Sequence, residues 1–265
     1  MSNLKITVEY DGTSFTGWQI QNRRKAGSAQ FKPTIQETIE RALRKILQEK
    51  IILIGAGRTD AGVHAQAQIA NFKTKSKIPP QKLQKALNAL LPDDIVITGT
   101  EEVNPDFHSR FCAKSKVYRY TILNRLYPSA LLKDKVYFYP YPLKINLMRR
   151  EARHLLGRHD FRSFCASGSG TKDTVRTIKK ITIKKLPYEL SAMSYQLSDC
   201  SVIVIDIEAN GFLYNMVRNI VGTLIEIGRG KFSAGSLKKI IRSKNRRIAG
   251  PTVPACGLCL RKVKY

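Results

Sequence analysis

One short segment of the chain carries four side chains of the kinds that do chemistry. Between Gly55 and His64 the sequence provides a cation at Arg58, a hydroxyl at Thr59, a carboxylate at Asp60 and the imidazole of His64. A carboxylate held against an arginine stays ionised and oriented, which a nucleophile or a general base requires. The same residues also fit a hairpin turn in which Asp60 accepts backbone hydrogen bonds and Arg58 is solvated. The sequence alone is compatible with both interpretations.

Other features narrow the chemistry of this segment. Glycines before Arg58 and after Asp60 allow a sharp turn or a close approach to a ligand. No second carboxylate lies nearby in the sequence, so the paired acids of a glycosidase are not supported. The chain has no glycine-rich phosphate loop, and Cys256 and Cys259 have the spacing of a zinc or redox half-site without a second pair. We therefore expect neither a metal nor a cofactor.

A second cluster combines aromatic rings with basic groups after Pro105. Its members are Phe107, His108, Arg110, Phe111, Tyr118 and Tyr120. Rings of this kind stack on unpaired bases while neighbouring cations neutralise phosphates. The alternative is that Phe107 and Phe111 belong to the core and that the two tyrosines face one side of a strand.

A third cluster is a helix with one cation among apolar residues. The segment Ala209–Gly222 has its apolar residues at helical spacing, and Arg218 lies in their midst. A guanidinium on such a helix needs a carboxylate or phosphate partner. An ordinary salt bridge would satisfy it, and an acidic catalytic residue would do so equally well.

The charge of the chain indicates a polyanionic partner. Lys and Arg number 46 and Asp and Glu number 20, which gives a formal net charge of +26. Such an excess opposes compact folding through self-repulsion and usually serves nucleic acid binding. An anionic membrane is the other candidate partner. The basic residues are spread along the chain, however, and form no long amphipathic basic helix.

The sequence favours a cytoplasmic location without membrane partners. The amino terminus lacks the apolar region of a signal peptide, and no stretch reaches the roughly 20 apolar residues of a membrane span. The five cysteines are an odd, scattered set, which fits free thiols in a reducing compartment.

The hydrophobic pattern predicts an α+β protein rather than a doubly wound sheet, because strands and helices alternate without a regular βαβ order. Alternation from Leu4 to Tyr10 predicts a strand, and the capping box Thr34–Glu37 begins a helix. Further strands are expected at 51–54, 66–72, 95–98, 117–123, 136–139, 177–183, 201–207 and 258–263. Further helices are expected around 83–90 and at 146–156, 212–227 and 234–242. A division near residue 105 separates halves 1–105 and 106–265, with no clear linker and one continuous sheet.

The three clusters, in this order, resemble the TruA family of tRNA pseudouridine synthases over nearly the whole chain. The segment Gly57–His64 is similar to the family signature, and Asp60 takes the position of its catalytic aspartate. Tyr118 matches the active-site tyrosine that packs on the target base. Arg218, within Met216–Gly222, matches the arginine that pairs with the aspartate.

Further motifs extend the resemblance to both ends of the chain. Glu9–Gly12 and Gly17–Gln19 look like the family's first strand and turn, and Gly257–Leu260 looks like its closing strand. Phe107–Phe111 is similar to its tRNA-contacting segment. The basic connection Asn22–Lys32 is longer than in the family's shorter members. The residues expected to bind substrate are Arg58, Phe107, His108, Arg110 and Tyr118.

The resemblance implies a fold and a reaction. The fold is a mixed, mainly antiparallel sheet flanked by helices and loops, with two pseudo-twofold-related halves. The reaction is the isomerisation of uridine to pseudouridine at positions 38, 39 and 40 of the tRNA anticodon stem-loop, by a homodimer with Asp60 as its nucleophile. A non-catalytic RNA-binding protein on the same fold is one alternative, and a synthase with another RNA target is a second. Arg58, Asp60, Tyr118 and Arg218 favour an enzyme, because RNA binding alone needs no carboxylate.

Overall fold

A computed structural model describes residues 1–20, 32–166, 168, 170–187 and 201–265 of the chain. Of the expected basic connection Asn22–Lys32, only Lys32 lies among these residues. The chain folds into two compact units. Unit 1 comprises Met1–Lys114 and Cys259–Tyr265, and unit 2 comprises Ser115–Leu258.

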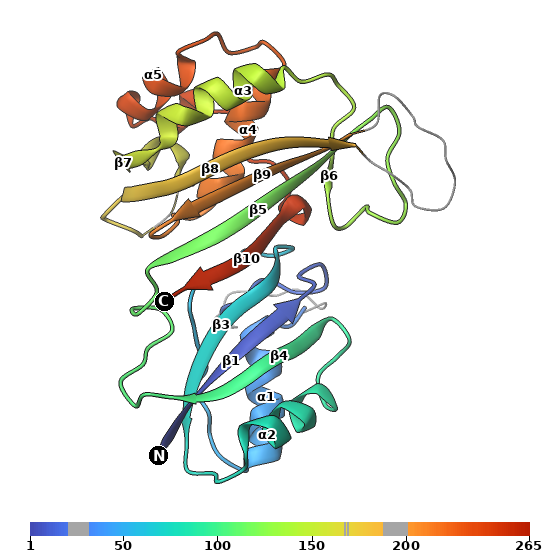
Figure 1. The fold of residues 1–265 in the computed structure, drawn as a ribbon, viewed down its shortest axis with the longest axis vertical. Helices are drawn as coiled ribbons and strands as arrows, with labels where there is room; N and C mark the ends of the chain where they lie inside the picture. Colours follow the sequence, from blue (N-terminus) through green and yellow to red (C-terminus); the bar gives the residue numbers. More distant parts are fainter. Residues whose placement is uncertain (21–31, 167, 169, 188–200) are drawn as a thin grey trace. The chain divides into compact units, whose positions relative to one another are not determined.

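Unit 1 is a mixed sheet with two helices (Figure 1). Its strands follow the order β4-β1-β3-β10, and β2 pairs with β3. β1 is antiparallel to both of its neighbours, whereas β10 runs parallel to β3. Helix α1 packs against α2, and α2 packs against β4. The bounds are β1 Ser2–Tyr10, α1 Ile35–Leu47, β2 Ile54–Gly55, β3 His64–Thr74, α2 Pro80–Asn88, β4 Ile95–Val103 and β10 Leu258–Lys264.

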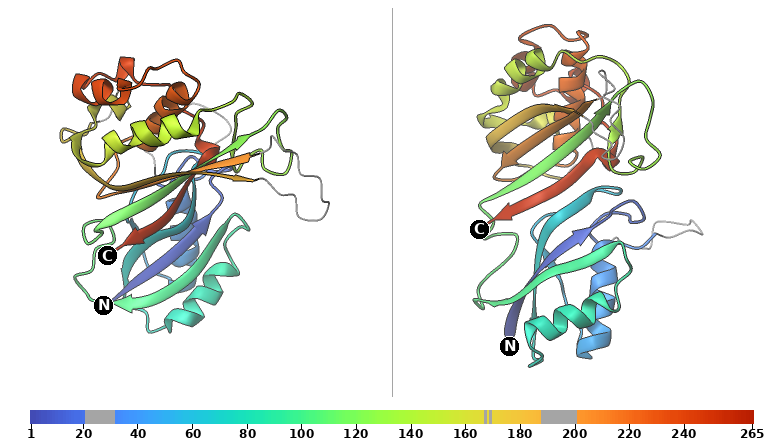
Figure 2. Two further views of the ribbon diagram at one scale, coloured as in Figure 1. Left: turned by 45° about the horizontal axis from the view of Figure 1, so that its top comes forward. Right: turned by 45° about the vertical axis from the view of Figure 1, so that its right-hand side comes forward.

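Unit 2 is a sheet with three helices, whose arrangement is seen from two sides in Figure 2. The antiparallel strands follow the order β5-β9-β8-β7, and the short β6 runs parallel to β5. Helices α3, α4 and α5 contact β8, β5 and β7 respectively. The bounds are β5 Ser115–Asn124, β6 Tyr137–Phe138, α3 Ile145–Ala152, β7 Gly157–Asp160, β8 Val175–Pro187, β9 Ser201–Ala209, α4 Met216–Gly228 and α5 Ser236–Ser243.

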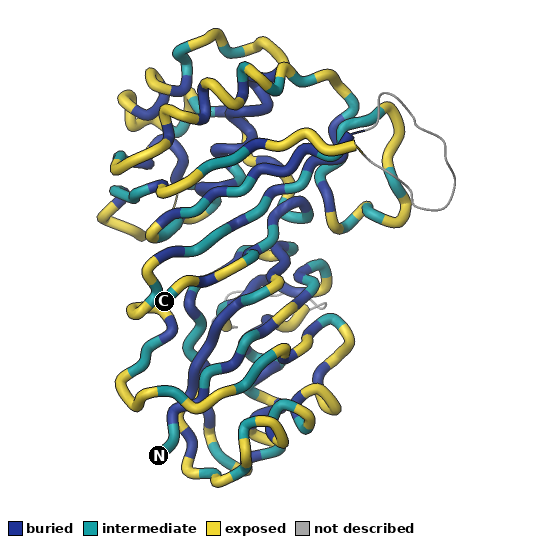
Figure 3. The backbone as a smooth tube through the Cα atoms, in the orientation of Figure 1, coloured by how far each residue is buried: buried dark blue, intermediate teal, exposed yellow. Residues whose placement is uncertain are grey.

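Each unit has its own apolar core, in which buried residues run along the strands and the inner helix faces (Figure 3). In unit 1, Ile39 and Leu43 of α1 and Leu83 of α2 are completely buried, together with apolar residues of the sheet. In unit 2, α4 buries every residue except Arg218. No helix of the described ranges is long and apolar enough to cross a bilayer.

The structure confirms the fold class, an α+β protein with a mixed, mainly antiparallel sheet. The helix expected after Thr34 is α1, whose first turn is capped because the Thr34 hydroxyl accepts a hydrogen bond from the Glu37 N–H at 3.2 Å. The expected strands from residues 4, 66, 95, 117, 177, 201 and 258 are all present, several of them longer than the apolar pattern indicated.

Several expectations about element boundaries were wrong, and the helix expected at 146–156, for example, ends at Ala152 as α3. The apolar run 51–54 is not a buried strand, because β2 begins only at Ile54 and Ile52 is 68% exposed. The helix expected from residue 212 begins at Met216, because Asn215 adopts a left-handed conformation that interrupts the backbone before it. Leu90 lies beyond the end of α2 and is largely exposed. β7 was not predicted, since its four residues show no apolar alternation.

Candidate active site

The loop that carries Asp60 joins β2 to β3 and is fixed mainly through its backbone. The Ala56 N–H donates to the Ile69 carbonyl at 2.7 Å, and the Val63 N–H donates to the Asp60 carbonyl at 3.1 Å. The Gln68 amide donates to the Gly57 carbonyl at 2.7 Å. Both ends of the loop are therefore bound to β3 or to the loop itself, which restricts the position of the half-buried Asp60.

A second layer of support comes from the turn after β1. The Trp18 N–H donates to the Thr59 carbonyl at 3.0 Å, and the Tyr10 and Thr59 hydroxyls are hydrogen bonded at 2.7 Å. Burial raises the pKa of Tyr10, so its phenol stays protonated and hydrogen bonded at all physiological pH values. These contacts hold the residue directly before Asp60 at both its carbonyl and its side chain.

Glycines make this close approach possible. Gly17 has φ +93°, and a Cβ added there would lie 2.6 Å from the Thr59 carbonyl oxygen. A Cβ on Gly55 would lie 2.5 Å from the Trp18 ring. The motif Gly17–Gln19 noted in the sequence therefore acts as a clamp on the Asp60 loop, a role that required the fold to be seen.

The other polar residues of the loop have their own partners. The Arg58 side chain is exposed, and its Nε donates to the Gln19 amide oxygen at 3.1 Å. His64 is buried at the start of β3, and its Nδ1 lies 2.9 Å from the Asp11 carboxylate. The Arg58 guanidinium therefore lies at the surface of the loop.

The segment Phe107–Phe111 divides into a packed part and an exposed part. The Phe107 ring packs against Tyr265 with 4.9 Å between centroids, and the Lys5 ammonium lies 5.8 Å from the Phe107 centroid. Phe111 is 76% exposed, which excludes the alternative that it belongs to the core. Phe107 is half-buried and packs against Tyr265, but it is not one of the buried core residues either.

The exposed part is a basic and aromatic turn formed by His108, Arg110 and Phe111. The His108 ring lies 4.2 Å from the Phe111 ring, and the Arg110 guanidinium lies 5.7 Å from the same ring. His108 Nδ1 accepts hydrogen bonds from the backbone N–H groups of Arg110 and Phe111, at 3.2 and 3.3 Å. The neutral ring therefore carries its proton on Nε2, where it is a hydrogen-bond donor.

Unit 2 carries the two remaining predicted catalytic residues. Tyr118 lies in β5, is almost fully buried, and contacts the Phe212 ring edge-on with 5.0 Å between centroids. Arg218 lies in the first turn of α4, where Nε donates to the Val253 carbonyl at 2.7 Å and Nη1 donates to the Asn215 amide oxygen at 2.9 Å. Two of its nitrogens are thus fixed within unit 2, and the plane of the guanidinium is set.

The helix position of Arg218 rests on a buried polar network. The Asn219 amide nitrogen donates to the Phe164 carbonyl at 2.8 Å, and its oxygen accepts bonds from Thr252 at 2.6 Å and from Arg246 at 2.9 Å. Arg246 also donates to the Gly250 carbonyl at 2.8 Å. This network holds the loop that supplies the Val253 carbonyl.

Sequence reasoning missed these supporting residues to different degrees. Asn219 is a polar residue on the same apolar helix as Arg218. Its residue type and position could therefore have identified it as a supporting residue from the sequence. Arg246 stands in a basic run and cannot be told from solvated arginines. Tyr10 and Trp18 lie in recognised motifs, but their contacts to the Asp60 loop are long-range.

The structure therefore sorts the predicted residues into two sets. Unit 1 contains Asp60, Arg58, Phe107, His108 and Arg110, and unit 2 contains Tyr118 and Arg218. No group of three or more His, Cys, Asp or Glu side chains within the described ranges is arranged to hold a metal ion.

Comparisons with known proteins cover both units. The family model described as tRNA pseudouridine synthase matches residues 6–112 and 152–265. Proteins named tRNA pseudouridine synthase A from Acetivibrio thermocellus and Clostridium acetobutylicum are each 46% identical to the chain over 265 residues, covering all of both chains. The protein of that name from Thermoanaerobacter sp. is 45% identical over the same span, again with full coverage.

Proposed function

Because the chain belongs to the tRNA pseudouridine synthase family, we propose that it is an isomerase that converts uridine to pseudouridine in tRNA. We further propose that its targets are positions 38, 39 and 40 of the anticodon stem-loop, and that it acts as a cytoplasmic homodimer without a cofactor. The observation that carries the proposal is the Asp60 loop, which lies in the matched residues and is clamped in place by the turn after β1.

The reaction exchanges the bond between ribose C1′ and uracil N1 for a bond between C1′ and C5. The C5 proton is lost and N1 gains a proton, so no oxidant or reductant is consumed. The uridine must first leave its stack, which costs roughly a few kcal/mol. Asp60 then acts either as a nucleophile at C1′ or as a base whose proton abstraction gives a glycal.

Arg218 is proposed to pair with the Asp60 carboxylate and keep it ionised. Its fixed Nε and Nη1 support this role, because a guanidinium whose plane is set loses less entropy on binding a carboxylate. Tyr118 is proposed to stack on the uracil, with the edge of Phe212 holding its ring, and is a candidate acceptor of the C5 proton.

RNA binding is assigned to Arg58, His108 and Arg110, with Phe107 in a supporting position. The net charge of +26 and the exposed Arg58 and Arg110 guanidinium groups favour a polyanion. The Phe107 ring is engaged by Tyr265, so this residue is proposed to hold the segment rather than to stack on a base.

The decisive measurement is tritium release from tRNA labelled at uridine C5. Asp60→Ala and Asp60→Asn are expected to abolish release while tRNA binding persists, because the reacting oxygens are lost or neutralised and the basic surface is not. Normal release by Asp60→Ala would exclude the assignment. A wild-type protein that binds tRNA without releasing tritium would instead be the RNA-binding alternative.

A further inference from the structure

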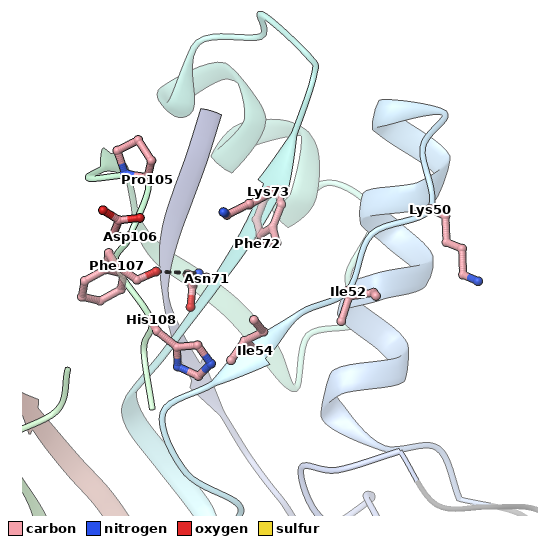
Figure 4. A pocket seen from close by; sticks show the side chains of 10 residues that line it. All are labelled: Lys50, Ile52, Ile54, Asn71, Phe72, Lys73, Pro105, Asp106, Phe107 and His108. Carbon is pink, nitrogen blue, oxygen red and sulfur yellow. Dashed lines mark hydrogen bonds between the residues drawn. The ribbon is translucent and has the colours of Figure 1, made fainter. Parts of the chain in front are cut away.

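Unit 1 contains a pocket beside β2 and the second half of β3 (Figure 4). The pocket has a volume of about 480 Å³. Its lining residues are Lys50, Ile52, Ile54, Asn71, Phe72, Lys73, Pro105, Asp106, Phe107 and His108. Ile54, which lines the pocket, pairs with Asn71 and is followed directly by the loop that carries Asp60. Asp60 is not among the lining residues, so a ligand in this pocket is not held by the proposed catalytic carboxylate.

One wall of the pocket is fixed by buried side chains. The Asn3 and Asn71 amide nitrogens donate to the Phe107 carbonyl at 2.9 and 3.3 Å, and the Ser109 N–H donates to the Asn71 amide oxygen at 2.9 Å. The Tyr265 hydroxyl adds a bond to the Ser109 carbonyl at 2.8 Å. The wall that carries His108 is thus held before any ligand arrives, which reduces the entropy lost on binding.

The floor and the rim of the pocket differ in chemistry. Ile52, which follows α1 in a loop and lines the pocket, is 68% exposed, although its neighbours Ile51 and Leu53 are buried. Lys50 and Lys73 supply two ammonium groups on opposite sides of Ile52 in the view of Figure 4, with Ile54 below Lys73. Asp106 lies across the pocket from Lys50 in Figure 4, and its carboxylate repels a phosphate that approaches that side.

We infer that this pocket binds one unpaired nucleotide of the tRNA, separate from the uridine that reacts, and this inference rests on the proposed function. The base lies on Ile52 and Ile54 beside the fixed wall, and the phosphates on its two sides meet Lys50 and Lys73, one each. The volume lies in the range of roughly 300–1,000 Å³ for small-ligand sites, which suits one nucleotide rather than a helix. Bases inside a helix are hidden in their stack, so the nucleotide is an unpaired one.

The charge of the site is tested with the double variant Lys50→Ala/Lys73→Ala. Its matched control is Lys82→Ala/Lys85→Ala, which removes two exposed lysines of α2 that do not line the pocket. We expect the pocket variant to raise the KM for tRNA about tenfold with kcat unchanged. Its slope of log Kd against log salt should fall by about 1.4, or 0.7 for each lost phosphate contact to a single strand. The control should change KM by less than about twofold.

The apolar floor is tested with Ile52→Glu, for which Leu90→Glu is the control at an exposed apolar position outside the pocket. Because Ile52 is exposed, its replacement leaves the core intact. We expect Ile52→Glu to bind tRNA more weakly than Lys50→Ala/Lys73→Ala does. Equal KM and Kd changes in pocket and control variants would overturn the inference. A wild-type protein that releases no tritium would refute the proposed function alone, because Kd values for tRNA still report on the pocket.

Discussion

The Asp60 loop and the Arg218 helix are positioned by opposite means. The loop is held by backbone hydrogen bonds and by glycines that let a neighbouring turn approach closely. Adding a side-chain atom at such a glycine should therefore disrupt the loop. The helix is held by side-chain hydrogen bonds centred on Asn219. Removing one of these hydrogen-bonding groups should therefore disrupt the position of the helix. The carboxylate on the loop and the guanidinium on the helix are thus held by different kinds of interaction. Substitutions that add an atom should therefore affect the loop, and substitutions that delete a group should affect the helix.

Gly17→Ala is expected to have the largest effect. The added Cβ would lie 2.6 Å from the Thr59 oxygen at a φ of +93°, and overpacking and backbone strain together cost about 3 kcal/mol. Both the free energy of unfolding and kcat should fall. Gly99→Ala is the control, because its Cβ would make an ordinary contact 3.5 Å from Thr7. Denaturant unfolding and tritium release measure both variants, and equal behaviour would show that the clamp is dispensable.

Asn219→Ala should have the next largest effect, now by deletion. The change leaves the Phe164 carbonyl, Thr252 and Arg246 each without one buried partner, which costs about 2 kcal/mol. We expect kcat to fall with stability, because the loop that supplies the Val253 carbonyl to Arg218 loosens. Asn146→Ala, at an exposed position of α3, should stay within about 0.5 kcal/mol of wild type.

Two tyrosine hydroxyls in unit 1 sharpen the comparison further. Tyr10→Phe removes the bond to Thr59, next to Asp60, and Tyr265→Phe removes the bond to Ser109, next to His108. Each change should cost about 1 kcal/mol of stability. Steady-state kinetics should separate them, since Tyr10→Phe lowers kcat and Tyr265→Phe raises the KM for tRNA. The same kinetic change in both would contradict separate roles.

The smallest expected effect concerns acid stability of unit 2. Burial tends to raise the pKa of Asp160, but hydrogen bonds from Thr174 and the Arg162 N–H, with the nearby Arg162 and Lys244 charges, lower it overall. A lowered carboxyl pKa stabilises the fold above the unfolded-state value and loses that effect as pH falls through the folded-state value. Asp160→Asn should therefore be less stable than wild type near neutral pH. The difference in unfolding midpoint should shrink below about pH 4, and a constant difference would contradict this origin.

Much of the fold and part of the site followed from the sequence. Period-2 alternation located the long strands, and the Thr34 cap located α1, because these signals depend on neighbouring residues. Asp60 and Arg218 stood out because each is a charged residue in an unusual local setting. Ile52 could not be assigned, because whether an isoleucine is buried depends on what packs over it.

The supports of the site were beyond the sequence for a different reason. The bonds from Tyr10 to Thr59 and from Asn3 to Phe107 join residues far apart in the chain, and only strand register brings them together. The start of α4 depended on the left-handed conformation of Asn215, which the apolar spacing of the helix concealed. Local patterns therefore identified the reacting groups, whereas long-range register determined how they are held.

The route of β10 has a consequence for the order in which the protein can form during synthesis. Cys259 and Leu260 pair with the start of β3, so unit 2 is an insertion within unit 1. While the chain is still emerging from a ribosome, the sheet beside the Asp60 loop lacks its fourth strand until all of unit 2 has been made. Pairing over so long a separation is slow. The pairing of β10 with β3 therefore forms last in the nascent enzyme, and a chain that stops before residue 258 never forms it.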